Sequence, residues 1–205
     1  MVKLHLVWKF AVLASCAAFG QDIAPTTHLP NQEIRISNLS LNPATSKSYS
    51  AVLAADLEAV FHDKDVCCGK NSTLEDVVGY ATLRDHTPLK ELAGKLQGRH
   101  LLSDGRPILV TAEYTPHSSI TPYQIVSLLR EQRPQIVSWQ SHLYVLYGAL
   151  FDDTCSNDGG CSYAIHKLFL RDARFSDSRR EVVFDREADD WDKFGGMLSL
   201  SVAPQ

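Results

Sequence analysis

The sequence lacks an excess of charge, a long apolar run and a paired metal-binding motif. Its 20 lysines and arginines stand against 24 aspartates and glutamates, a formal net charge of −4, which excludes the basic footprint of a nucleic-acid-binding protein. No apolar run reaches the roughly 18–20 residues that a membrane-spanning helix needs. The chain has no His-Glu-x-x-His and no paired Cys-x-x-Cys, and the acidic stretch at Asp152-Asp153 lacks EF-hand spacing. The sequence therefore predicts no metal ion and no cofactor.

The N-terminal residues have the pattern of a secretory signal peptide. Lys3 and Lys9 precede a short apolar run that ends in the small residues around Ala18-Phe19-Gly20. Cleavage after Gly20 would export the protein to the periplasm or outside the cell. An alternative is that Leu13-Ala14-Ser15-Cys16 acts as a bacterial lipobox, which would place a lipid anchor on Cys16.

Export determines how the cysteines are interpreted. Without residues 1–20 the chain keeps Cys67, Cys68, Cys155 and Cys161, and four cysteines allow three pairings. Cys155 and Cys161 flank a loop that contains two glycines, so we expect them to form a local disulfide. In the alternative pairing both would bond to Cys67 and Cys68, which would then be structural.

The rest of the sequence predicts one domain behind an extended arm. Residues 21–48 are rich in proline and polar residues and read as the arm, and residues 49–205 read as the domain. Its 44% hydrophobic content is enough for a core. Apolar spacing and capping signals predict helices over about 49–61, 72–83, 88–97 and 121–131. Strands are predicted at 107–112, 135–139, 142–150, 163–171, 181–184 and 197–202. Helices first and antiparallel strands later indicate an α+β fold.

Cys68 is the candidate nucleophile. It stands just before the helix that the capping box Ser72-Glu75 predicts, and a helix N-terminus lowers the pKa of a thiol. We prefer Cys68 to Cys67 as the nucleophile, because Gly69 lets the backbone turn sharply directly after Cys68. A thiolate nucleophile needs a base, and His142 at the start of a predicted strand is our candidate.

This order of residues resembles the bacteriocin-processing-peptidase-like branch of the papain-like cysteine peptidases. Cys68-Gly69 is similar to the Cys-Gly-Pro segment of that branch, and the strand from His142 to Gly148 resembles its His-x-Val-Val-x-x-Gly strand. The resemblance implies a papain-like α+β fold, with N-terminal helices followed by an antiparallel β-sheet. It also implies that Asp172, which follows the next strand, orients the histidine. The family's usual glutamine before the cysteine is missing; His62, six positions upstream of Cys68, is the candidate oxyanion donor.

Three functions follow as hypotheses. The first is an exported thiol hydrolase that acts on a peptide or another acyl substrate through a cysteine thioester. The second is a catalytically degenerate module of the same fold that binds a peptide. The third is a secreted domain of unrelated fold that is stabilised by disulfides. Each candidate also has an ordinary alternative role: His142 as the end of a turn, Asp172 as a turn aspartate and His62 as a surface residue at a helix end.

Overall fold

A computed structural model describes residues 26–37, 39, 41–44, 46–62, 87–101, 105–157, 159–187, 189 and 191–205. The α-helices are α1 (Tyr49–His62), α3 (Leu89–Leu96) and α4 (Pro122–Arg130). The strands are β1 (Thr26–Arg35), β2 (Gly98–Leu101), β3 (Pro107–Pro116), β4 (Gln135–Trp139), β5 (His142–Ser156), β6 (Cys161–Arg171), β7 (Glu181–Asp185) and β8 (Phe194–Pro204). Three short 3-10 helices are η2 (His117–Ser119), η3 (Ser178–Arg180) and η4 (Trp191–Lys193).

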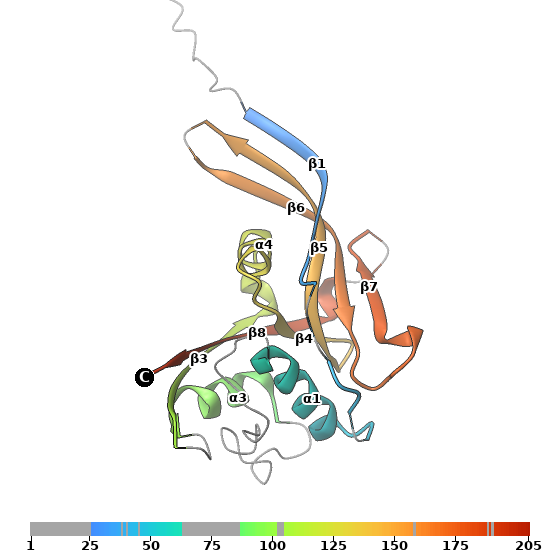
Figure 1. Cartoon of the computed structure of the whole chain (residues 1–205). Helices are drawn as coiled ribbons and strands as arrows, with labels where there is room; N and C mark the ends of the chain where they lie inside the picture. Colours follow the sequence, from blue (N-terminus) through green and yellow to red (C-terminus); the bar gives the residue numbers. More distant parts are fainter. Residues whose placement is uncertain are drawn as a thin grey trace, which may run out of the picture.

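One antiparallel sheet holds all of these strands. Its order is β2-β3-β8-β4-β5-β6-β7, and β1 pairs with the part of β5 that extends beyond β4. β5 is 15 residues long whereas β4 has 5, so the far half of β5 needs a second neighbour, and β1 supplies it. β1 and the far halves of β5 and β6 form a three-stranded arm that extends away from the helices (Figure 1).

The core lies between this sheet and the helices. In Figure 1, α1 and α3 lie on one side of the central strands and α4 on the other. Leu53 and Leu57 of α1 and Leu92 of α3 are fully buried, as are Ile136 and Val145 on the central strands. Burial of such apolar side chains, at roughly 25 cal/mol per Å² of apolar surface, is the main force that holds the layers together.

The expected fold class is wrong. The first described element is a strand, β1, and it belongs to the same sheet as the C-terminal strands. The described residues contain no N-terminal helix bundle: β2 and β3 separate α3 from α4, and the sheet is larger than all three helices together. The described chain is thus a mainly antiparallel β-sheet protein with three short helices. The physical reason for the error is that β1 is almost wholly exposed and polar, so its sequence carries little strand signal.

Many individual elements lie where the sequence predicts them. α4 begins after Thr121, whose hydroxyl accepts a hydrogen bond from the Gln124 backbone N–H at 3.1 Å, and β4 has the predicted limits. β5, β6 and β8 are longer than expected, and β2 was not predicted. The helix predicted over 72–83 and the leader at 1–20, with Cys16, lie outside the described residues.

Candidate functional site

The predicted nucleophile lies outside the described residues. Cys68, together with Cys67 and Gly69, lies in the segment 63–86, which is outside the described residues. His62 is the last residue of α1, but its side chain is likewise outside the described part. The roles of Cys68 as nucleophile and His62 as oxyanion donor therefore stay predictions.

His142 is the first residue of β5 and is exposed. It pairs with Trp139 across a two-residue turn, Gln140-Ser141, in which both residues have positive φ (50° and 65°). This is the backbone conformation of a type I′ hairpin turn. The imidazole makes no hydrogen bond to any other side chain that the structure describes. The turn thus holds this exposed residue at a defined place on the backbone.

Asp172 follows β6 and is buried, but its carboxylate contacts an arginine rather than an imidazole. Arg174 donates from Nε at 2.8 Å and 3.0 Å, from Nη2 at 2.5 Å and from its backbone N–H at 2.9 Å. The same Nη2 also lies 3.3 Å from the Tyr144 hydroxyl. Tyr144 stands two residues after His142 in β5, so alternation puts both side chains on one face of the strand. Asp172 is thus linked to Tyr144 through Arg174, and no hydrogen bond among the described residues joins it to His142.

A second acid, Asp56, lies close to Asp172 and Arg174. It is fully buried in α1, and both carboxyl oxygens lack a hydrogen-bond partner among the described residues. Burial raises the pKa of Asp56 well above its ordinary range; the charge of Asp172 adds to this effect, and the charge of Arg174 opposes it. Burial is also the largest cause of the raised pKa of Tyr144. Sequence analysis missed Asp56, although its position three residues after Leu53 and four before Val60 places it on the apolar face of the helix.

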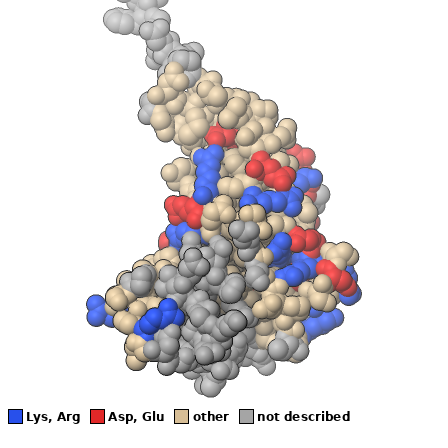
Figure 2. Space-filling model, in the orientation of Figure 1, with Lys and Arg blue, Asp and Glu red and all other residues tan. Residues whose placement is uncertain are grey.

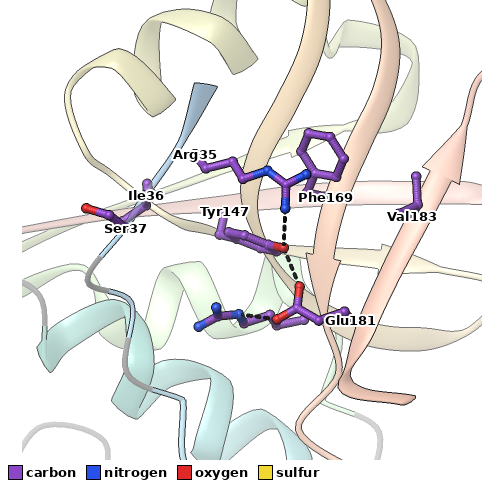
Figure 3. Close-up of a pocket in the computed structure, with 8 residues that line it drawn as sticks. Arg35, Ile36, Ser37, Tyr147, Phe169, Glu181 and Val183 are labelled. Atoms are coloured by element: carbon purple, nitrogen blue, oxygen red, sulfur yellow. Dashed lines mark hydrogen bonds and ion pairs between the residues drawn. The ribbon is translucent and has the colours of Figure 1, made fainter. Parts of the chain in front are cut away.

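The structure also has a pocket of about 440 Å³. It is lined by Arg35, Ile36, Ser37, Tyr147, Phe169, Arg171, Glu181 and Val183, which come from β1, β5, β6, β7 and the segment after β1 (Figure 3). Neither His142 nor Asp172 is among its described lining residues, although Arg171 and Asp172 are adjacent in the chain. No sequence pattern predicts this pocket, because β1 and β7 lie near opposite ends of the chain and contribute to one pocket only in the folded sheet.

Charged and hydroxyl groups form a connected set in the pocket. Arg35 Nη1 lies 3.4 Å from the Tyr147 hydroxyl, which donates to Glu181, and Arg171 Nε donates to the other oxygen of Glu181 at 3.0 Å (Figure 3). The pKa of Tyr147 is raised, first by burial and then by its hydrogen bond to Glu181. On the face seen in Figure 2, basic and acidic side chains lie together in the middle and on the right, whereas the upper part of the described surface is largely uncharged.

The predicted disulfide between Cys155 and Cys161 is confirmed. The two residues are directly opposite each other at the tip of the β5–β6 hairpin, and their sulfurs are bonded. Their Cα atoms are 4.1 Å apart, slightly closer than the usual 4.4–6.8 Å. Asp153 lies close to both sulfurs, but bonded cysteines are poor metal ligands, and Asp153 accepts a hydrogen bond from Arg130 at 2.8 Å.

Among the described helices, none combines the length and the apolar character that crossing a membrane would require. No protein-family model matches the chain, and comparisons with curated proteins and with solved structures likewise found no significant match.

Proposed function

We propose that the protein is an exported thiol hydrolase in which Cys68 attacks an acyl carbonyl and His142 acts as the general base. In the first step the thiol proton passes to an imidazole nitrogen and the sulfur–carbon bond of a thioester forms. The protonated imidazole then gives its proton to the leaving group as the old acyl bond breaks. Water, deprotonated by the same imidazole, hydrolyses the thioester and restores the thiol.

The observation that carries this proposal is the disulfide between Cys155 and Cys161. These are the two cysteines that could have bonded to Cys67 and Cys68 in the purely structural alternative, and a bonded sulfur is not available for another bridge. The pairing therefore leaves Cys67 and Cys68 without those partners. A disulfide is also typical of an exported protein, which supports the predicted signal peptide.

The surroundings of His142 give further support. The side chain is exposed at the end of a tight hairpin, so an imidazole there can meet both a substrate and a nucleophile from another segment. Beside it, the Asp172–Arg174 pair and Tyr144 provide a polar environment at the same end of β5. Because Arg174 holds the Asp172 carboxylate, Asp172 does not orient the imidazole through a direct hydrogen bond in this proposal.

A peptide-binding module without catalysis is the second candidate. It is favoured by the bonds from Arg174, which engage both oxygens of the Asp172 carboxylate. A carboxylate held in this way does not orient a histidine as the acid of a catalytic triad does. The two candidates differ in whether an acyl group is transferred to the protein.

Acyl transfer can be measured with p-nitrophenyl acetate on protein that keeps the disulfide between Cys155 and Cys161. A hydrolase should release a burst of one equivalent of nitrophenolate, followed by steady turnover. Cys68→Ala should abolish both phases, and His142→Ala should slow the burst by roughly 10²–10⁴-fold, the usual contribution of a general base. Cys67→Ala is the matched control and should keep the burst.

A wild-type protein that gives no burst, although its thiols react with iodoacetamide, would favour the binding module. Equal loss in both cysteine variants, or loss only in Cys67→Ala, would contradict the choice of Cys68.

A further inference from the structure

Two guanidinium groups in the pocket are each fixed by stacking on an aromatic ring. The Cζ atom of Arg35 lies 3.7 Å from the centroid of Phe169, and the Cζ atom of Arg171 lies 4.7 Å from the centroid of Tyr147. Stacking of this kind holds a guanidinium plane in one orientation while its N–H groups stay available at the edge. In Figure 3, Arg35 and Tyr147 lie side by side, with Glu181 on the far side of the Tyr147 hydroxyl.

Most N–H groups of these two arginines are unused. Arg35 donates to Glu33 and to Tyr147, and Arg171 donates to Glu181 and to the Leu39 carbonyl. A guanidinium has five N–H donors. About three therefore remain on each arginine without an acceptor among the described residues. The side chains are 45% and 22% exposed, so these donors can reach a bound molecule.

The local charge is positive although the whole chain is acidic. Among the described residues that line the pocket, Glu181 is the one acidic residue, against two arginines. A third, Arg180, lies near Arg171: burial lowers the pKa of Arg180, and the charge of Arg171 lowers it further. Its Nε is buried without a hydrogen-bond partner among the described residues. An anion in the pocket would relieve this repulsion between like charges. Glu33 also pairs with Arg35, but this pair is about half exposed and weakly held.

We propose that this pocket is a binding site for a carboxylate that is attached to an apolar or aromatic group. The planar forks of Arg35 and Arg171 suit the two oxygens of a carboxylate, which accept parallel N–H bonds. The apolar part has a surface to cover, because Val183 lines the pocket and is 49% exposed. His142 is not among the described residues that line the pocket, and this assignment goes beyond the proposed catalytic function without using it.

N-acetyl-phenylalanine is a suitable probe, because it carries a free carboxylate and an aromatic ring. Isothermal titration of the oxidised full chain should show saturable binding at millimolar concentration or below. N-acetyl-phenylalanine amide has the same ring without the charge and should bind at least tenfold more weakly. Inorganic phosphate, which has the charge without the ring, should also bind more weakly than the probe.

Three variants test which groups are responsible. Arg35→Gln should weaken binding by about 10- to 100-fold, since hydrogen bonds to a charged group contribute roughly 1.5–3 kcal/mol. Glu181→Gln should strengthen binding several-fold, because it removes the competing carboxylate from Arg171. Arg179→Gln is the matched control: Arg179 is an exposed arginine that pairs with Asp177 and does not line the pocket, so affinity should not change.

The proposal is wrong if the acid and its amide bind equally well, or if the wild-type protein shows no saturable binding. It is also wrong if Arg35→Gln and Arg179→Gln have the same affinity as wild type. Phosphate that binds as tightly as the probe would mean that the apolar surface plays no part, which contradicts the assigned ligand class. Thermal unfolding of each variant confirms that it is folded during the titration.

Discussion

Asp56 is the residue whose environment departs furthest from what its chemistry favours. A carboxyl group fully buried in α1, with no hydrogen-bond partner among the described residues and with Asp172 close by, is stable in the fold only when it carries its proton. Arg174 gives only partial compensation, because its hydrogen bonds are directed to Asp172. Folding and protonation of Asp56 are therefore linked.

The sign of this linkage follows from the direction of the pKa shift. The folded-state pKa of Asp56 lies above its unfolded value, so the folded state binds more protons. The contribution of the protonated group is fully present below the unfolded pKa of about 3.9 and is lost as pH rises toward the folded pKa. Asp56→Asn removes the titration and keeps the shape. At pH 8 we expect the free energy of unfolding of this variant, measured with urea, to exceed that of wild type by roughly 1–3 kcal/mol. The difference should shrink toward pH 4.

The charged groups that act on Asp56, namely Asp172 and Arg174, are present in both proteins, so the comparison isolates the carboxyl group of Asp56. Glu113→Gln is a control at an exposed carboxylate and should follow the wild-type curve at every pH. Parallel stability curves for Asp56→Asn and wild type from pH 4 to pH 8 would show that Asp56 does not titrate as described.

At the scale of elements, the docking of β1 on β5 depends on one glycine. A Cβ atom at Gly148 would lie 2.6 Å from the Ile34 backbone oxygen and 3.0 Å from both Arg35 and Phe169. Gly148→Ala should therefore push β1 away from β5, with a loss of about 1–3 kcal/mol in unfolding free energy, the usual effect of overpacking. The change should also weaken binding of N-acetyl-phenylalanine, because Arg35 and Phe169 both line the pocket.

Gly94→Ala provides the opposite case. Gly94 lies in α3, and a Cβ atom there would have no heavy atom within 4 Å. This substitution should stabilise the protein by about 0.5–1 kcal/mol through helix propensity alone and should leave the pocket unchanged. Urea unfolding measures both variants. If Gly148→Ala proved as stable as Gly94→Ala, the close contact between β1 and β5 would not exist in solution.

The elements also show what sequence patterns can and cannot predict. α4 and β4 were predicted closely, because a threonine cap, Pro122 and Pro134 are local signals that act over a few residues. β1 was not, because its pairing with β5 joins Thr26 to Ser156 and depends on an edge that β4 leaves open. The local disulfide was predicted from a short loop with glycines, and the structure has it.

For the candidate site the same distinction holds. The sequence placed His142 at the start of a strand and Asp172 after the next one, and both positions are as expected. It did not predict that Arg174, two residues after Asp172, would fold back and bind that carboxylate, because such a contact depends on a turn beyond the strand. A sequence pattern predicts local elements, whereas contacts between residues distant in the chain depend on how the strands pair in the sheet.

At the scale of the whole molecule, the arm and the central sheet share their strands. β5 and β6 run from the disulfide at the arm's tip into the central sheet. In the core of that sheet the ring centroids of Trp139 and Phe184 lie 5.2 Å apart, and those of Trp191 and Phe194 lie 4.9 Å apart. Loss of pairing in the arm therefore acts directly on the central strands. We expect the arm and the core to unfold together.

Removal of the disulfide tests this coupling. Cys155→Ser with Cys161→Ser should lower the free energy of unfolding by about 2 kcal/mol, since the bridge closes only a short loop. Urea unfolding of this variant should still be a single transition, with the same midpoint by tryptophan fluorescence, which reports on the central aromatic residues, and by far-UV circular dichroism, which reports on the whole sheet. Because Cys67 and Cys68 are untouched, the burst with p-nitrophenyl acetate should persist. An early transition seen by circular dichroism but not by fluorescence would mean that the arm folds as a separate unit.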